Sequence, residues 1–397
     1  MAITAEVPHE PFRLSMLWYD KRYRSNVIQI LVLVGVLSFF GYLINNAANA
    51  LAAQQKTFGF SFLFLPASYD INQTLIPYTS SDTHLRATIV GILNTGLVAI
   101  VGIFIATILG FILGVLRLSS NWLVSRLVYW YVEFTRNVPL LLQILFWHGI
   151  FINSFPHPRA YRDVEGSIFL TNRGIITPKP LLDDAIWFVV AALVVGIVGA
   201  VIYAQRARRK QEATGQISPV FRVGLGLIIG LPLVAYFLAG MPVSFDYPAF
   251  QGFNFRGGMT ISPELASLTF ALAIYTAAFI SENVRAGILA VSHGQTEAAY
   301  ALGLRPNRTM NLIIIPQALR VIIPPLTSQY LNLTKNSSLA IAIGYMDVVA
   351  TLGGITLMQT GKELETNILL MAFYLSISLT ISMLMNWYNR SIAFKER

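Results

Sequence analysis

The sequence contains no cysteine, and it carries few charged residues for its length. Without cysteine, the 397 residues can form no disulfide, thiolate nucleophile or cysteine-ligated metal site. Only 12% of the residues are Asp, Glu, Lys or Arg, whereas soluble proteins carry about 25%. Hydrophobic residues make up 55% of the chain, and its mean hydropathy is +0.61. These values predict an integral membrane protein, and the long apolar runs described below predict that it is all-α.

A nucleotide-binding P-loop is also missing. That motif needs Gly, four residues, then Gly-Lys-Ser/Thr, but Gly361-Lys362 is followed by Glu363, and Thr356 stands where the first glycine is needed. No nucleophile–base pair is evident, and the scattered histidines predict no metal site. We therefore expect no catalytic residue here, and any ATP hydrolysis requires a separate subunit. The histidines are His9, His84, His148, His157 and His293.

Long uncharged stretches predict about eight membrane-spanning helices, because each crossing needs about 20 apolar residues. The predicted spans lie between Arg24 and Lys56, between Arg86 and Arg117, from Arg136 to about Asn153, from Ala185 to Gln205, from about Val220 to Gly240, from about Pro263 to Glu282, from Arg320 past Lys335, and between Glu365 and Arg390.

The basic residues that flank these spans predict the orientation of the chain. With the N-terminus inside, 18 Lys and Arg side chains fall on inside segments and 8 on outside segments. The small-residue sequence Ala48-Asn49-Ala50 resembles a signal-peptidase site. The apolar run before it, Val27 to Ile44, exceeds the 7–15 residues of a signal peptide. An uncleaved anchor is thus favoured over a cleaved leader.

One stretch, Glu297 to Pro316, differs from the apolar sequence around it. Helix-forming residues from Glu297 are followed by Gly303, which can end a helix at no steric cost. Pro306 suits the first turn of a second helix, and apolar sequence returns at Leu312. The pattern predicts a helix, a tight turn and a second helix at the membrane surface, suited to a soluble partner. An ordinary interfacial helix-turn-helix is the plainer alternative.

The spacing of this stretch resembles the cytoplasmic coupling loop of permeases from ABC importers. That family's pattern is Glu-Ala-Ala, three residues, Gly, nine residues, Ile, one residue and Leu-Pro. The chain departs from it only at Ile315, where the family usually has Leu, and this change keeps volume and apolarity. The residues that carry the match, and that it assigns to ATPase coupling, are Glu297, Ala298, Ala299, Gly303, Ile313 and Pro316.

The resemblance covers about residues 85–390 and is to the polar amino acid branch of these permeases. Further segments that carry it are Gly91-Ile92-Leu93-Asn94-Thr95, Arg136-Asn137-Val138-Pro139-Leu140-Leu141-Leu142-Gln143, Glu282 with Arg285 and Gly287, and Leu319-Arg320 with Pro324-Pro325-Leu326. Leu17-Trp18-Tyr19-Asp20, Asn121 to Ser125 and the extra helices resemble the Q-type membrane subunit of general L-amino-acid transporters.

This resemblance implies a five-helix type I importer core, extended by an N-terminal helix and a two-helix insertion. The implied segments are a cytoplasmic N-terminus at 1–26, an extra helix at 27–49, a periplasmic loop at 50–86, a permease domain at 87–390 containing the inserted hairpin 184–240 and the coupling loop 297–316, and a cytoplasmic tail at 391–397. The outside loops 50–86 and 153–183 are long; they fit either a packed cap or a surface for an external partner.

The resemblance also implies a function and partners. The chain is expected to be the permease subunit of an ATP-driven importer in the bacterial inner membrane, with both termini cytoplasmic. A periplasmic binding protein would deliver L-amino acids, and a dimer of ATP-binding subunits would drive transport. A second permease, expected to be a different chain, would complete the path within membrane lipid. No cofactor is expected in this chain, with ATP and Mg on the partner ATPase, and no nucleic acid is expected.

Polar residues within spans are candidates for the translocation path, because ionisable groups at membrane depth are costly. Glu282 and Arg285 share a helix face and either line the path or form a structural ion pair, which is favoured. Lys335 and its neighbours either line the path or join helices by hydrogen bonds. Arg136 either braces a kink before Pro139 or meets substrate. The full set is Glu282, Arg285, Asn332, Lys335, Asn336, Arg136 and Gln143.

Two further patterns concern helix geometry and packing. Gly110 with Gly114, and Gly226 with Gly230, each permit close helix approach, either within the chain or in a dimer. Pro324-Pro325 is expected to kink or break the seventh span.

Two other classes of function fit part of these observations. An ion-driven secondary transporter or channel would explain the spans and the buried charges, but it would leave the Glu297–Pro316 stretch unexplained. A membrane anchor in a sensor complex would carry no substrate flux at all.

Overall fold

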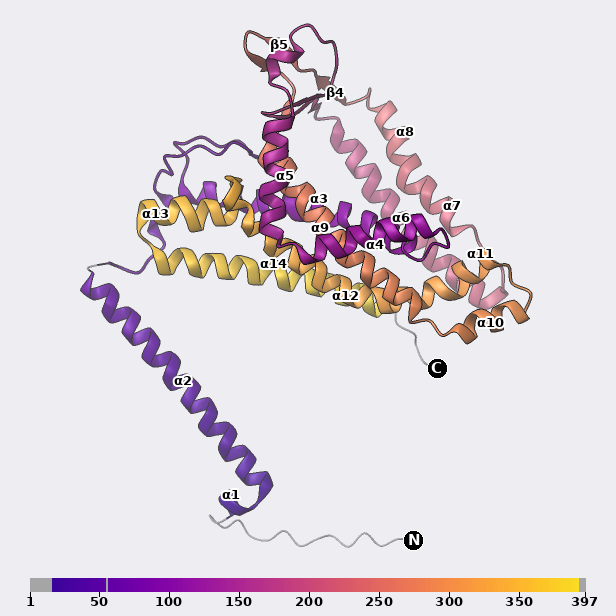
Figure 1. Cartoon of the computed structure of the whole chain (residues 1–397), viewed down its shortest axis with the longest axis horizontal. Coiled ribbons are helices and arrows are strands. Elements are labelled where there is room, and N and C mark those ends of the chain that lie inside the picture. The colour runs from indigo at the N-terminus through magenta and orange to yellow at the C-terminus, as the bar shows by residue number, and fades with distance from the viewer. Residues whose placement is uncertain (1–15, 55, 393–397) are drawn as a thin grey trace. The chain divides into compact units, whose positions relative to one another are not determined.

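The computed structural model describes residues 16–54 and 56–392 (Figure 1). The chain divides into two compact units. The first comprises Met1–Phe62 with Lys362–Glu365, and the second comprises Leu63–Gly361 with Thr366–Arg397. The predicted cytoplasmic ends are residues 1–26 and 391–397. Residues 1–15 of the first and 393–397 of the second lie outside the described residues.

The first unit is built on one long apolar helix. Helix α1 (Met16–Tyr19) precedes α2 (Lys21–Ala53), whose 33 residues confirm the first predicted span. None of the apolar stretch of α2 is buried by protein, so its side chains suit hydrocarbon. Within this unit, the backbone N–H of Gly59 donates to Glu365 Oε1 over 3.0 Å. The Lys56 Nζ pairs with Glu363 Oε1 at 3.8 Å.

The remaining helices lie in the second unit, except that the first residues of η1 and α14 belong to the first unit. They are η1 (Ser61–Phe64), α3 (His84–Leu116), α4 (Trp122–Asn137), α5 (Leu140–Ser154), η2 (Pro158–Tyr161), α6 (Ile186–Thr214), α7 (Val220–Leu225), η3 (Gly226–Gly230), α8 (Leu231–Leu238), α9 (Pro263–Leu289), α10 (His293–Ala301), α11 (Pro306–Thr309), η4 (Met310–Ile314), α12 (Ile315–Asn336), η5 (Ser337–Ile343), η6 (Val349–Thr356), α13 (Leu357–Thr360) and α14 (Glu363–Ile392). Over the described residues, seven helical stretches are long and apolar enough to cross a membrane, and they match seven of the eight predicted spans.

The third predicted span, from Arg136 to about Asn153, corresponds to α5 (Leu140–Ser154). Val138 and Pro139 separate it from α4, which precedes it. Proline lacks a backbone donor, and it forces the preceding residue into an extended conformation. At 1.5 Å per residue, the 15 residues of α5 reach about 22 Å, less than the roughly 30 Å hydrocarbon core. The helix α5 alone is therefore shorter than the hydrocarbon core, and α4 runs in a different direction from it (Figure 1).

Helices α3 and α9 form the centre of the packed core. A Cβ on Gly110 would lie 2.5 Å from Ile280 Cβ, and one on Gly114 would lie 2.6 Å from Val284 Cβ. Only glycine permits this approach, so this pair serves an internal contact rather than a dimer. A Cβ on Gly226 or Gly230 would have nothing within 4 Å, and no internal contact of the described chain uses that pair.

Helix α12 runs through both of its prolines. Pro324 and Pro325 lie inside the single helix Ile315–Asn336, so the helix does not break at this position, and the kink expected there stays a prediction. The α-helical hydrogen-bonding pattern changes at the two ends of α12 instead. The π-helical turn η4 precedes α12, and the 3-10 helix η5 follows it.

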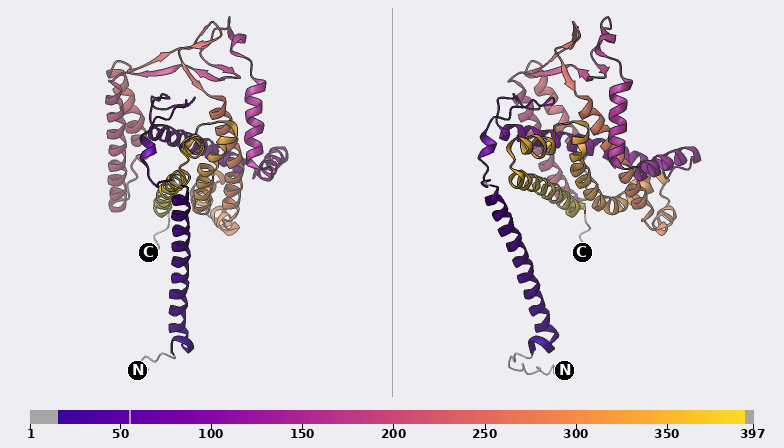
Figure 2. Two further views of the ribbon diagram at one scale, coloured as in Figure 1. Left: turned by 90° about the vertical axis from the view of Figure 1, so that its left-hand side faces the viewer. Right: turned by 60° about the vertical axis from the view of Figure 1, so that its left-hand side comes forward.

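Short antiparallel strands occupy two segments that flank the inserted hairpin. One sheet has the order β1 (Phe169–Thr171), β2 (Gly174–Thr177), β7 (Met259–Ile261); β3 (Lys179–Leu182) pairs with β4 (Val243–Asp246), and β5 (Ala249–Gln251) with β6 (Asn254–Arg256). The views agree that these sheets lie beyond the ends of α5, α6 and α8 (Figure 2). The segment 153–183, predicted as a long outside loop, thus contains the strands β1, β2 and β3.

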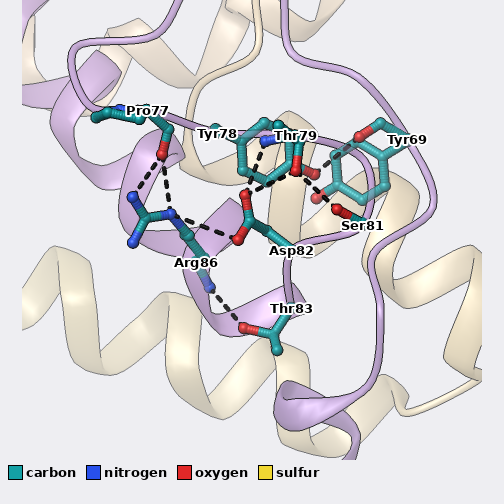
Figure 3. A network of polar contacts seen from close by, with 8 residues as sticks. All are labelled: Tyr69, Pro77, Tyr78, Thr79, Ser81, Asp82, Thr83 and Arg86. Carbon is teal, nitrogen blue, oxygen red and sulfur yellow. Dashed lines mark hydrogen bonds and ion pairs between the residues drawn. The ribbon is translucent and has the colours of Figure 1, made fainter.

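The loop before α3 is held by its own polar contacts (Figure 3). The Arg86 guanidinium donates to the Pro77 carbonyl through Nε at 2.9 Å and Nη2 at 2.6 Å. The Asp82 carboxylate accepts from the Thr79 backbone N–H at 2.8 Å, and the Tyr78 hydroxyl donates to the Tyr69 carbonyl at 2.8 Å. Burial, with smaller repulsion from neighbouring acidic groups, raises the pKa of Tyr78 to about 12. This segment is thus a packed structure.

Candidate functional site

The stretch Glu297 to Pro316 folds as the predicted helix, turn and helix. Helix α10 begins at His293, four residues before the predicted start, and ends at Ala301. Gly303 adopts φ +75°, its N–H donates to the Tyr300 carbonyl at 2.9 Å, and the Leu304 N–H donates to the Ala299 carbonyl at 3.1 Å. This pair of bonds is the Schellman motif, which needs a left-handed residue best supplied by glycine.

A second helix begins directly after the turn. Arg305 is extended, and Pro306 occupies the first turn of α11. The Thr309 hydroxyl donates to the Arg305 carbonyl at 3.2 Å, and Thr309 itself is buried. Gln317 on α12 donates to Gln295 on α10 at 3.3 Å. The turn is therefore fixed at both of its flanks.

The residues of the matched pattern fall into exposed and buried positions. Glu297, Ala298, Gly303 and Pro316 are exposed, Ile313 is half-buried and Ala299 is buried. Leu302 at the turn is 81% exposed. The element therefore presents polar and apolar side chains outward from a rigid backbone, as a docking surface requires.

Glu282 and Arg285 belong to a cluster of four charged side chains. The Arg285 Nη2 pairs with Glu282 Oε1 at 2.6 Å, and the Arg117 Nη1 pairs with Glu282 Oε2. Arg117 Nη2 also lies 3.5 Å from Glu133 Oε1. Three helix segments are thereby joined: the end of α3, α4 and α9. This geometry is that of the structural ion pair, and Arg117 and Glu133 extend it. The sequence pattern marks Arg117 only as the end of a predicted span and gives no role to Glu133.

Lys335, Asn332 and Asn336 lie apart from that cluster. They occupy the last turns of α12, whereas Gly287, close to Glu282, lies against Ile322 near the beginning of α12. The Leu333 side chain meets Gly102, which is midway along α3, so this end of α12 lies at mid-depth. Asn332 and Lys335 are exposed in the isolated chain, and Asn336 is half-buried.

Arg136 and Gln143 lie at the interruption between α4 and α5. Gln143 is buried, and its Nε2 donates to the carbonyls of Thr135 at 2.8 Å and Val138 at 2.9 Å. These bonds supply donors to two carbonyls that lack a helical N–H partner at the interruption. The Arg136 guanidinium lies 5.4 Å from the centre of the Phe279 ring. Gln143 therefore joins the two sides of the interruption, and Arg136 lies against α9.

Sequence reasoning missed a buried carboxylate between η5 and η6. Asp347 is fully buried; its Oδ1 accepts from the Ala350 N–H at 2.8 Å, and Oδ2 has no hydrogen-bond partner within the described chain. Burial raises the pKa of Asp347 to about 7, against the opposing effect of backbone N–H groups. Nothing in the one-dimensional pattern distinguishes it from a loop aspartate. No cluster of three or more His, Asp or Glu side chains in residues 16–54 and 56–392 could hold a metal.

Comparisons with known proteins identify the family. The family model of the binding-protein-dependent transport system inner membrane component matches residues 215–397. The chain is 48% identical to the general L-amino acid transport system permease protein AapQ of Rhizobium johnstonii, over 97% of this chain and 96% of that protein. The chain belongs to the family of ABC-importer permease subunits.

Two further relatives match over nearly the whole length. The glutamate/glutamine/aspartate/asparagine transport system permease protein BztB of Rhodobacter capsulatus is 50% identical over 100% of both chains. The putative amino-acid ABC transporter permease protein YhdX of Escherichia coli is 48% identical over 96% of this chain and 98% of its own. A solved amino acid ABC transporter with histidines is 20% identical with a TM-score of 0.46, over 78% of this chain and 95% of that one, a likeness that supports no further argument.

The predicted family and the multi-pass helical fold are thus confirmed. The relationship extends beyond the predicted 85–390, because the alignment with BztB covers the whole chain and so includes α2. The coupling and pathway roles of individual residues stay predictions.

Proposed function

We propose that this permease carries L-amino acids across the bacterial inner membrane, driven by ATPase subunits that act on the Glu297–Pro316 element. The observation that carries the proposal is the rigid helix–turn–helix with its exposed Leu302 and left-handed Gly303. The amino-acid substrate is inferred from relatives named for amino-acid transport that match over the full length. With no P-loop in its sequence, the chain requires a partner to hydrolyse ATP.

The proposed partners are an ATP-binding dimer, a periplasmic binding protein and a second, different permease, with both termini of this chain cytoplasmic. The chain would bind no cofactor itself, and ATP and Mg would sit on the ATPase. Lys335, Asn332 and Asn336 are proposed to line the path, since they lie at mid-depth where polar groups are costly. Glu282 and Arg285 are proposed to hold helices together, with Arg117.

A matched pair of glycines tests the coupling assignment. Gly303→Asp places a carboxylate in a left-handed position whose Cβ meets nothing within 4 Å. Gly215→Asp does the same in the inserted hairpin, at φ +70° and with equally open surroundings. We expect Gly303→Asp to abolish amino-acid uptake while the protein stays in the membrane, and Gly215→Asp to transport normally. Normal uptake by Gly303→Asp would overturn the coupling role.

A mild detergent pull-down tests the partners. We expect a tagged chain to recover an ATPase and a second permease, identified by mass. Recovery of an ATPase alone would indicate a permease homodimer. If no ATPase is recovered, and uptake survives ATP depletion yet collapses with an uncoupler, the transporter is ion-driven and the proposal is wrong.

A further inference from the structure

A cavity of about 510 Å³ opens where α3 ends and α4 begins. Its wall is basic and hydroxyl-rich, and it contains no acidic side chain. Principal lining residues are Arg117, Ser119, Ser120, Trp122, Arg126 and Arg285.

Each arginine is held in place at this wall. Arg117 and Arg285 are fixed by Glu282 and Glu133, which pair with them and are not among the lining residues. A guanidinium has five N–H donors, so these pairs leave donors for another acceptor. Arg126 has no carboxylate within ion-pair distance in the described chain; its guanidinium lies 5.3 Å from the Tyr129 ring centre and 5.9 Å from that of Trp130. The three arginines and two glutamates leave one net positive charge.

The backbone adds to this positive field. The 16-residue helix α4 starts at the cavity, and its first turn is capped by Asn121, whose Oδ1 accepts from the N–H groups of Leu123 and Val124. The positive end of the helix dipole therefore faces the same space. Arginines, hydroxyls and a helix start are together the groups that bind phosphate oxygens.

Apolar side chains beside the cavity point to the source of that phosphate. Along α4, Trp122, Leu123, Leu127 and Trp130 are all more than half exposed. Tryptophan beside arginine is typical of the membrane interface, where the ring lies at headgroup level. A free phosphate would gain nothing from this apolar face, whereas acyl chains would cover it.

We propose that this cavity binds the phosphodiester headgroup of an anionic phospholipid. The headgroup meets the Arg126 and Arg285 guanidinium groups and the serine hydroxyls, and the acyl chains lie along the exposed face of α4. The assignment to the inner leaflet rests on the cytoplasmic orientation in the proposed function; binding itself does not depend on transport.

Lipid retention tests this proposal without measuring uptake. The full-length chain is purified and equilibrated with dioleoyl phosphatidylglycerol or dioleoyl phosphatidylcholine, and bound lipid is counted by native mass spectrometry. We expect phosphatidylglycerol to be retained preferentially, and Arg126→Gln to weaken its retention about fivefold, the effect of one basic residue near an anionic surface. Ser120→Glu, which adds a negative charge to the wall, should act in the same direction.

The control is Arg222→Gln, an exposed arginine on α7 that is predicted to lie at the same membrane face. It should retain phosphatidylglycerol as the unmodified chain does. Equal retention by Arg126→Gln and Arg222→Gln would overturn the proposal. Competition by inorganic phosphate at millimolar concentration would overturn the lipid assignment, since it would show a site for a free anion. Absence of amino-acid uptake by the unmodified chain, with lipid retention intact, would overturn only the proposed function.

Discussion

The α3–α9 pair and the inserted hairpin of α6 and α8 both consist of apolar helices. They differ in the share of their apolar residues that is buried inside the chain. In α9, 67% of the apolar stretch is buried inside the chain, compared with 6% in α6 and none in α7–α8. Hydrophobicity alone therefore does not show which helices build the core. Lipid satisfies an apolar surface as well as protein does, so close packing must come from shape. The α3–α9 contact has Gly110 and Gly114 at its closest points, and the hairpin has one such point, where a Cβ on Gly196 would lie 2.1 Å from the Leu227 carbonyl oxygen.

The largest expected effect comes from filling a glycine at the core contact. Gly114→Leu would place atoms where Val284 already lies, and we expect a loss of about 3 kcal/mol or more of stability through overpacking. Gly226→Leu, whose Cβ meets nothing within 4 Å, should be tolerated. Detergent melting curves and the yield of monodisperse protein would show the difference. Equal tolerance would mean that the α3–α9 contact is not required.

The ion pairs of the two regions should differ as well. Glu282→Gln removes the shared partner of Arg117 and Arg285 in a partly buried site, and about 2 kcal/mol of stability should be lost. Glu212→Gln removes a pair with Arg208 that is exposed on the hairpin, where pairs contribute at most about 1 kcal/mol. If Glu282→Gln melts normally but stops uptake, Glu282 belongs to the path instead.

A third test concerns pH. The folded pKa of Asp347, about 7, lies above the usual aspartate value of 3.8. The unfolded chain then releases the proton first, so the contribution of Asp347 to stability is full below pH 3.8 and is lost as the pH rises to about 7. Asp347→Asn should remove this fall and raise the melting temperature by roughly 5 °C at pH 8. The gain should be smaller at pH 4.5, and equal melting of both proteins at pH 8 would contradict it.

The smallest effect is expected from removing the hairpin altogether. Leu182 of β3 pairs directly with Val243 of β4, so an Asn-Gly turn could join them in place of residues 183–242. We expect the remaining core to melt within about 1 kcal/mol of the full chain, because so little of the hairpin is buried. Failure of this variant to insert or fold would show that the hairpin supports the core.

Sequence patterns located most of this architecture because long apolar runs and their caps are local. Gly303 and Pro306 mark a turn through their own backbone preferences, and the turn is where they predicted it. The contact of Arg117 with Glu282 joins residues 165 positions apart, and no local spacing reveals it. The short strands were not predicted because three or four residues show too little alternation of polar and apolar side chains to be recognised.

The pairing of Leu182 with Val243 has a consequence for how such a chain can grow. An insertion that leaves and returns through one antiparallel stem changes neither the end of α5 nor the beginning of α9. It also contains two helical stretches long and apolar enough to cross a membrane, and an even number of crossings keeps the sidedness of every later helix. A single added crossing would invert the Glu297–Pro316 element to the opposite face. Because the number of added crossings is even, this region can be gained, lengthened or lost while the later helices keep their orientation in the membrane.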